Sequence, residues 1–348
     1  SHPITHPPEE LLKDGFDAVL IASGAQIGTP LGIEGEDGRG VFQAIDFLER
    51  VSRGEGVDLG DRVIVIGGGN TAVDAARTAK RLARSVEVIY RRTRKEMPAA
   101  REEVEELLTE GIQLEELVSP LRIILENGRV VALEGIRNKL GPTGPDGRRQ
   151  PIPIEGSEFR IDADSIILAI GQRPDISFID RTTIPLNRDG TIVADLQTGR
   201  TGHEHVYAGG DVVRGPATIV EACADGRRAA EAICRQLGVG AALSAVRPPE
   251  LSGEDILQVK RVRARKMLQH RGAMLPPEKR GGFELIEVAL TDEEAVEEAK
   301  RCVQCSNHCD KCVEVCPNRC NYTFLISPVS LSLPKVSCQQ GMLSCLLY

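Results

Sequence analysis

The apolar residues of this chain gather in short runs, and the most informative of these runs flank a glycine turn. Val63–Ile66 and Val86–Tyr90 are β-branched and apolar, which is typical of buried strands. Gly67–Gly69 follow the first run and open directly into an Ala-rich helical stretch. The order strand, turn, helix, strand predicts a unit of the length that holds a dinucleotide, and with it an α/β fold.

Two further apolar runs end on glycine. Phe16–Ser23 is a predicted strand that Gly24 terminates, and Asp164–Gly171 repeats its character. This internal similarity predicts two related domains. Between the two runs, Val41–Val51 has the pattern of a short amphipathic helix.

The middle of the chain mixes charged and strand-like stretches. Arg101–Glu110 predicts a charged, exposed helix. Val130–Arg137 and Phe159–Ile161 predict strands on either side of a Gly/Pro-rich loop, Gly141–Pro153.

The glycine turn has the pattern G-x-G-x-x-A, which runs from Gly67 to Ala72. Glycine allows a pyrophosphate to reach backbone N–H groups at a helix N-terminus, because no Cβ intervenes. The strand before the turn and the helix after it supply the context that this pattern needs. We therefore predict dinucleotide binding, and a purely structural glycine turn is the alternative.

The end of the second strand bears on which dinucleotide is bound. An NAD site usually carries Asp or Glu about 20 residues after the glycines. This chain has Arg91 and Arg92 there, with Arg94 and Lys95 close behind. Guanidinium groups hold a 2′-phosphate through paired, charge-assisted hydrogen bonds. The residues favour NADPH over NADH, and a solvated basic loop is the alternative.

A second cofactor signal lies further along the chain. His205–Val212 predicts a short strand that ends on Gly209, Gly210 and Asp211, and a predicted helix starts at Pro216–Thr218 and continues to Gln236. A carboxylate beside a helix N-terminus suits the ribityl chain of a flavin. The alternative is an aspartate that only stabilises a turn.

The cysteines are concentrated near the end of the sequence. There are ten, none before Cys223, and six fall between residues 302 and 320. From the first of these the spacing is C-x2-C-x3-C-x2-C-x3-C-P, and its last three positions match the run that holds iron–sulfur cubanes in bacterial ferredoxins. The predicted ligands are Cys302, Cys305, Cys309, Cys312 and Cys316, with Cys320 close behind. One cubane needs four thiolates, so either spare cysteines remain here or some of these ligands serve a second cluster.

Zinc is the rival metal, because closely spaced CxxC pairs also make tetrahedral sulfur sites. Zinc sites usually separate their cysteine pairs by about a dozen residues or more. Here Cys305 and Cys309 are separated by three residues, so the spacing favours a [4Fe-4S] cluster.

Composition narrows the class of protein. The chain has 348 residues, a net charge of −8 and 3% aromatic residues, which argues against a nucleic-acid surface. Its sequence has no apolar run of membrane-spanning length, and its first residues do not resemble a signal peptide. We expect a cytoplasmic protein that neither inserts into a membrane nor binds nucleic acid.

Taken in order, five segments of the sequence resemble a known group. They are FDAVLIASGA, IGGGNTAVDAAR, YRRTRKEMPA, ILAIGQRPD and VYAGGDVVRGPATIVEACADGRRAA. The chain resembles the glutamate synthase small-subunit-like flavoproteins of the pyridine nucleotide–disulfide oxidoreductase superfamily. Its cysteine-rich end is most similar to the selenate reductase iron–sulfur subunit branch. The similarity covers about residues 8–320.

The resemblance implies particular contacts for each cofactor. No side chain is expected to act as an acid or base catalyst. The expected NADPH contacts are Gly67, Gly68, Gly69, Asn70 and Thr71 at the pyrophosphate turn, and Arg91 and Arg92 at the 2′-phosphate. The expected contacts of FAD are Gly171, Gly210, Asp211, Ala217 and Thr218.

The resemblance also implies an FAD-binding domain that is split by an inserted NADPH domain. The family's first FAD glycine fingerprint is absent, so we expect a fragment that begins inside the FAD domain. The expected divisions are 1–50 (incomplete FAD-binding domain), 51–170 (NAD(P)H-binding domain), 171–240 (return to the FAD-binding domain), 241–300 (helical connector), 301–321 (iron–sulfur segment) and 322–348 (disordered tail).

The activity implied by the resemblance is electron transfer. Electrons would pass from NADPH through FAD to a [4Fe-4S] cluster, and on to an acceptor protein or a larger reductase or synthase complex. Ser1–Ala222 contains no cysteine, which excludes a dithiol mechanism there. The alternative from another class is a non-catalytic scaffold whose cysteines bind zinc.

Overall fold

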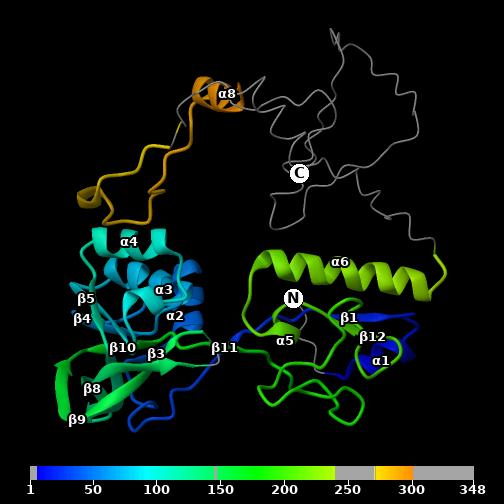
Figure 1. The fold of residues 1–348 in the computed structure, drawn as a ribbon, viewed down its shortest axis with the longest axis horizontal. Helices are drawn as coiled ribbons and strands as arrows, with labels where there is room; N and C mark the ends of the chain where they lie inside the picture. Colours follow the sequence, from blue (N-terminus) through cyan, green and yellow to red (C-terminus); the bar gives the residue numbers. More distant parts are fainter. Residues whose placement is uncertain (1–5, 145–146, 240–269, 271, 301–348) are drawn as a thin grey trace.

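The computed structural model describes residues 6–144, 147–239, 270 and 272–300. Two bodies lie side by side in Figure 1. The larger body contains the elements from β2 to β11, and the smaller body contains α1, β1 and the elements from β12 to α6. The predicted cysteine ligands, Cys302 to Cys316, and the predicted tail lie outside the described residues.

A five-stranded sheet of order β3-β10-β4-β5-β6 forms the centre of the larger body. All of its neighbouring strands are parallel. Its strands are β3 (Val41–Gln43), β10 (Ser165–Leu168), β4 (Arg62–Ile66), β5 (Ser85–Tyr90) and β6 (Gln113–Glu116). The two sequence-predicted strands that flank the glycine turn, β4 and β5, are confirmed as neighbours.

Both faces of this sheet are covered, because successive side chains of a strand point to opposite faces. Val63 and Val65 of β4 pack against the helices α2 (Ala44–Ser52), α3 (Asn70–Lys80) and α4 (Arg101–Thr109).

The alternate residues of β4, Ile64 and Ile66, face a second, antiparallel sheet on the other side. That sheet has the order β7-β8-β9. Its strands are β7 (Val118–Glu126), β8 (Arg129–Thr143) and β9 (Arg149–Asp162). Layers of helices, parallel sheet and antiparallel sheet therefore enclose two hydrophobic cores.

The smaller body is built around a parallel pair of short strands, β1 (Val19–Ile21) and β12 (Val206–Ala208). Its helices are α1 (Pro8–Lys13), α5 (Asp211–Arg214) and α6 (Ile219–Gln236). Its core includes Ile21, Val206 and Ala208 from the strands, together with Ile184 and Ile192 from the segment before β12.

Two of the crossings that the chain makes between the bodies pair with each other. The strands β2 (Ile27–Gly28) and β11 (Gln172–Arg173) form an antiparallel pair, visible between the bodies in Figure 1. The amide of Thr29 also donates to the carbonyl oxygen of Gly171 at 3.0 Å. Hydrogen bonds between the two crossings thus position one body relative to the other.

A later segment packs onto the outside of the larger body. It contains the short helices η2 (Pro277–Lys279) and α8 (Asp292–Lys300). Arg280 in this segment is 8% exposed, and its guanidinium pairs with Glu106 of α4. Figure 1 shows the segment running above α4. The predicted helical connector therefore includes a helix at α8, and residues 241–269 of it lie outside the described residues.

Three sequence predictions about secondary structure need correction. The strand expected over Phe16–Ser23 comprises only Val19–Ile21. Val41–Gln43 is strand β3 and not the start of a helix, because it pairs with the buried strand β10 and this pairing overrides its helical pattern. The helix begins at Ala44, in α2.

The third correction concerns the loop expected at Gly141–Pro153. Strand β8 continues to Thr143 and β9 begins at Arg149, so a hairpin occupies most of this stretch. Strand β9 lies at the edge of its sheet, and prolines within sheets are largely confined to edge strands. The helix expected at Arg101–Glu110 is confirmed as α4. The helix expected from Pro216–Thr218 to Gln236 is confirmed as α6, which begins at Ile219 with Thr218 as its N-cap.

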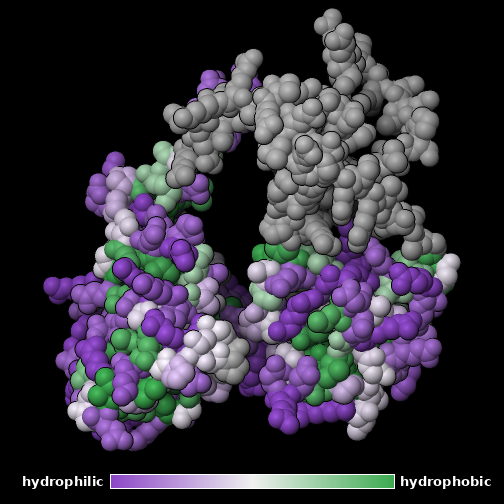
Figure 2. Space-filling model, viewed as in Figure 1, coloured by the Kyte–Doolittle hydropathy of each residue, from purple (hydrophilic) through white to green (hydrophobic). Residues whose placement is uncertain are grey.

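The surface of both bodies is largely polar. Figure 2 shows polar residues covering most of the visible face of both bodies, with apolar residues in patches between them. Among the described residues, no helix is long and apolar enough to cross a membrane.

Candidate functional site

The glycine turn lies between β4 and α3, at the carboxyl edge of the five-stranded sheet. Gly67 has φ +152°, and a Cβ there would overlap the carbonyl oxygen of Ala169, the residue after β10. A Cβ on Gly68 would lie 2.5 Å from the ring of Tyr90. At Gly69 the nearest atom is Cγ of Pro98, at 4.0 Å. The first two glycines allow close packing, whereas the third faces open space.

Helix α3 begins directly after the turn, with Gly69 as its N-cap. No side chain caps this end and its first turn contains no acidic residue. Its first N–H groups and the positive end of the helix dipole therefore favour an anion at this position. The side chain of Asn70 has a structural contact, since its Oδ1 accepts a hydrogen bond from the amide of Ala100 at 2.9 Å.

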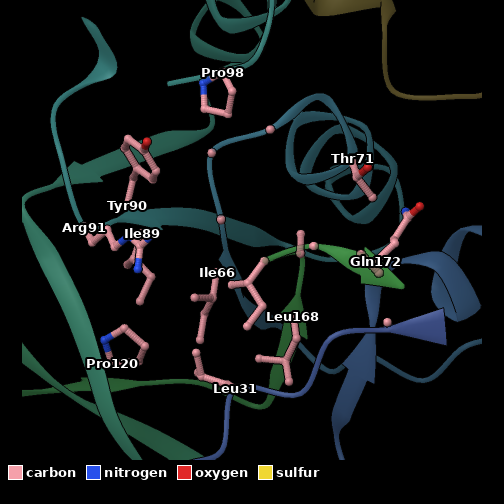
Figure 3. A pocket seen from close by; sticks show the side chains of 18 of the residues that line it. Leu31, Ile66, Thr71, Ile89, Tyr90, Arg91, Pro98, Pro120, Leu168 and Gln172 are labelled. Carbon is pink, nitrogen blue, oxygen red and sulfur yellow. The ribbon is translucent and has the colours of Figure 1, made fainter. Parts of the chain in front are cut away.

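A cavity of about 710 Å³ opens beside the turn (Figure 3). The glycine turn, Asn70 and Thr71 line it, as do Arg91, Arg92 and Arg148. Apolar side chains from the strands form its floor, among them Ile66, Ile89 and Leu168. The described lining residues include no aspartate or glutamate. The cavity is therefore cationic in a chain whose net charge is −8.

The structure separates the roles of the two arginines that follow β5. Arg91 is exposed and lines the cavity. Arg92 is 5% exposed, and its Nε donates to the carbonyl oxygen of Arg149 at 2.6 Å. That carbonyl belongs to the first residue of β9, so Arg92 ties the end of β5 to the hairpin between β8 and β9.

Buried polar side chains fix the backbone at these arginines. Asn138 of β8 is 4% exposed, and its Nδ2 donates to the carbonyl oxygen of Arg91 at 3.1 Å and to Oγ of Ser119 at 2.8 Å. The amide of Leu117 donates to the carbonyl oxygen of Arg92 at 3.0 Å. Hydrogen bonds from Asn138 and Leu117 thus hold the end of β5 on the side of the antiparallel sheet.

The short helix η1 (Arg94–Glu96) also contacts the end of β5. The hydroxyl of Tyr90 donates to the carbonyl oxygen of Glu96 at 2.9 Å. The carboxylate of Glu96 accepts from Thr93, and from Nε of Arg149 at 2.7 Å. The hydrogen bond from Thr93, and then that from Arg149, keep the pKa of Glu96 below its ordinary value.

A second, smaller cavity of about 210 Å³ lies in the smaller body. Gly209, Gly210, Asp211 and Thr218 line it, and Ala217 lines both cavities. Gly210 has φ +75°, a conformation that favours glycine. Oδ1 of Asp211 accepts a hydrogen bond from the amide of Ala217 at 3.2 Å. The strand end and the start of α6 are thereby held together.

The start of α6 is capped by its own residues. The hydroxyl oxygen of Thr218 accepts from the amide of Glu221, and the carboxylate of Glu221 accepts from the amide of Thr218 at 3.1 Å. This reciprocal arrangement is a capping box. Thr218, which the sequence predicted to contact FAD, is therefore the N-cap of α6.

Sequence reasoning missed one residue that shapes this second cavity. Asp225 of α6 is 5% exposed, and its Oδ2 accepts from the amide of Gly210 at 3.1 Å and from Nε of Arg214 at 2.6 Å. Burial raises the pKa of Asp225, but the hydrogen bonds from Arg214, Gly210 and Arg228 outweigh it and hold the pKa below its ordinary value. An aspartate three positions before Arg228, within a predicted helix, was the available signal.

The larger cavity draws its lining from both bodies. Gly171 and Gln172 at the second crossing, and Pro216 and Ala217 before α6, line it together with the glycine turn. Of the predicted contacts, Gly210, Asp211 and Thr218 lie in the smaller cavity instead. The two groups of predicted contacts therefore form adjoining cavities, with Ala217 at the boundary.

A parallel sheet with this glycine turn is joined to a second unit, in which a strand runs into Gly-Gly-Asp ahead of a long helix. This combination defines the class of two-nucleotide flavoproteins. The chain belongs to the pyridine nucleotide-disulphide oxidoreductase family, which its residues 7–226 match. The family predicted from the sequence is confirmed.

Two curated relatives and one solved structure illustrate the similarity. In an alignment of 334 positions that covers 85% of this chain and 49% of the other protein, the chain is 38% identical to the NADPH-Fe(3+) oxidoreductase subunit beta of Geobacter sulfurreducens. In an alignment of 248 positions that covers 66% of this chain and 52% of the other protein, it is 36% identical to the glutamate synthase [NADPH] small chain of Escherichia coli. The chain thus spans about half the length of these relatives.

The solved structure is that of Mycobacterium tuberculosis FprA in complex with NADPH. It matches with a TM-score of 0.55 over 66% of this chain and 65% of that chain, at 23% identity. This likeness confirms the predicted α/β fold of the flavoprotein class.

Proposed function

We propose that this chain is part of an NADPH-dependent flavin and iron–sulfur oxidoreductase, in which it passes electrons to a partner subunit or acceptor. One observation carries the proposal: a single cationic cavity is lined by the glycine turn of one body and by Pro216 and Ala217 of the other. A nucleotide in this cavity would touch both bodies. The two curated relatives support the proposal, since both carry NADPH in their names and are named as a subunit or a small chain.

The residues of the larger cavity fit NADPH. The open side of Gly69 and the uncapped start of α3 suit a pyrophosphate, because N–H groups and the helix dipole point there. Arg91 supplies a cation for the 2′-phosphate. The apolar floor formed by Ile66, Ile89 and Leu168 excludes water from the bound nucleotide.

The residues of the smaller cavity fit part of a flavin. The carboxylate of Asp211 remains close to the surface of this cavity and can accept hydroxyl hydrogen bonds, and Gly210 lets the chain turn tightly beside it. Asp225 keeps that turn in place through Gly210 and Arg214. When bound, the two cofactors supply hydride transfer, and the chain positions them and shapes their surroundings.

The proposed [4Fe-4S] site rests on the sequence. Its predicted ligands are Cys302, Cys305, Cys309, Cys312 and Cys316, and the cysteine spacing supports them. Metal analysis of the anaerobically purified full chain tests this part. We expect about four iron atoms per cluster and matching sulfide. Zinc without iron would contradict it and would favour a zinc-binding scaffold.

The nucleotide assignment is tested by comparing NADPH with NADH as donors to an artificial dye. Replacing Arg91 with alanine is expected to raise KM for NADPH about tenfold, since charge-assisted hydrogen bonds to a phosphate contribute roughly 1.5–3 kcal/mol, while KM for NADH stays close to the parent value. Arg84→Ala is the matched control. Arg84 is exposed and lies just before β5, at the opposite end of that strand. An equal loss with both nucleotides would overturn the assignment.

A further inference from the structure

We propose that Arg148, in the hairpin between β8 and β9, is the second cation of the 2′-phosphate subsite and acts there with Arg91. This inference rests on the proposed function and deepens it. The sequence pattern instead paired Arg91 with its neighbour Arg92. The structure assigns Arg92 a different task and brings in a residue that lies 57 positions after Arg91.

The charge distribution of the cavity is the first observation. Three arginines, Arg91, Arg92 and Arg148, line it, and its described lining residues include no carboxylate. The hairpin thus brings a cation from a separate sheet to the same cavity as the end of β5. Three guanidinium groups that line one cavity favour a ligand with several negative charges.

The second observation is that Arg92 is bound to the hairpin. Its side chain is buried, and its Nε donates to the carbonyl oxygen of Arg149. Since Arg149 directly follows Arg148, this bond also positions the backbone of Arg148. Arg92 is therefore a positioning residue, and the exposed Arg91 is the arginine of the pair that can turn toward a phosphate.

The third observation is that hydrogen bonds hold the backbone of Arg148 and the side chain of Arg149, the residue after it. The amide of Gly144 donates to the carbonyl oxygen of Arg148 at 2.8 Å. The guanidinium of Arg149 donates to Glu96, which η1 holds beside the end of β5. A cation held on a fixed backbone loses less conformational freedom on binding than one on a free loop.

The chemistry distinguishes this subsite from the pyrophosphate subsite. A 2′-phosphate carries up to two negative charges and presents three acceptor oxygens, which two planar guanidinium groups can share. NADH has a hydroxyl at this position and offers these cations no charge. Arg148 is therefore expected to contribute to the choice between the two nucleotides.

The test measures binding of 2′,5′-ADP and of 5′-ADP to the full chain by calorimetry. These probes differ by the 2′-phosphate and need no redox turnover. We expect Arg148→Ala to weaken 2′,5′-ADP about tenfold, to leave 5′-ADP within about twofold, and to be partly rescued in Arg148→Lys. Arg84→Ala removes an exposed arginine just before β5, outside the cavity lining, and is expected to change neither affinity.

Each outcome has a distinct meaning. Unchanged 2′,5′-ADP affinity in Arg148→Ala would overturn the inference, and so would an equal loss of both probes, because that would place Arg148 at the pyrophosphate. The Arg91→Ala variant separates this failure from that of the proposed function. If the parent chain bound the two probes equally, and Arg91→Ala changed neither, the NADPH assignment itself would fail.

Discussion

At the scale of single residues, the three glycines of the turn have different surroundings. Gly67 is enclosed by backbone, since a Cβ there would overlap the carbonyl oxygen of Ala169. Gly69 has no atom closer than Cγ of Pro98, at 4.0 Å. One position therefore serves the packing of the sheet and the other leaves room for a ligand, although both are the same residue type in one short motif.

This difference predicts opposite behaviour of two alanine variants. Gly67→Ala is expected to destabilise the fold by roughly 3 kcal/mol, because the chain must shift away from Ala169 and because its φ of +152° disfavours a side chain. Gly69→Ala is expected to melt within about 3 °C of the parent, because alanine is only a poorer N-cap than glycine. It is expected to bind NADPH at least tenfold more weakly, since its new methyl group occupies the space beside the pyrophosphate.

Thermal melts and titrations with NADPH check both expectations. Equal stability of the two variants would contradict the packing argument. Unchanged NADPH affinity in Gly69→Ala would contradict the placement of the pyrophosphate, whatever its stability.

At the scale of elements, the later segment that contains η2 is attached to α4 through one buried cation. The guanidinium of Arg280 pairs with Glu106, and its Nε donates to the carbonyl oxygen of Leu275 at 2.6 Å. Arg81, the residue after α3, adds a bond from its Nε to the carbonyl oxygen of Gly282 at 3.0 Å. Few apolar side chains support this contact, since Phe283 and Leu285 are exposed.

Arg280→Ala is therefore expected to release this segment while the five-stranded sheet stays folded. The amides of Leu275 and Val288, which bond across the segment to Ile286 and Ala273, should exchange with solvent roughly tenfold faster or more. Hydrogen exchange measures this directly. Lys279→Ala is the control, because Lys279 is an exposed neighbour. Faster exchange in β4 would show instead that Arg280 supports the whole larger body.

At the scale of the whole molecule, the crossings β2 and β11 bring the two bodies together at one cavity. Residues on both sides line it, from the glycine turn to Ala217. The binding site proposed for NADPH is therefore a property of the assembled chain. Neither body contains all of its lining residues.

This arrangement predicts which amides a ligand protects. NADP⁺ should slow hydrogen exchange at Gly69–Thr71 and also at Ala217, whose amide bonds to Asp211. The probe 2′,5′-ADP lacks the nicotinamide half and should protect only the first group. At a hundred times Kd, a stabilisation of about 2.7 kcal/mol slows exchange about a hundredfold. If NADP⁺ protected only the larger body, the two sides of the cavity would not act as one site.

Sequence alone determined the local units of this protein. The βαβ unit around Gly67–Gly69, the helix that follows Thr218, and the family were all predictable, because hydrophobic period, glycine positions and capping residues act over a few neighbouring residues. The strand at Val41–Gln43 and the hairpin around Arg149 were not predictable from the pattern. Their structure depends on hydrogen bonds to strands far away in the chain.

The same limit applies to the site. The pattern placed Arg91 beside the nucleotide but gave Arg92 an identical role, since adjacent arginines look alike in a sequence. Only the tertiary structure buries Arg92 against Arg149, brings Arg148 to the cavity, and adds Ala217 from the other body. Those contacts join residues separated by dozens of positions, so packing decides them, whereas short-range patterns fixed the turn and the helix.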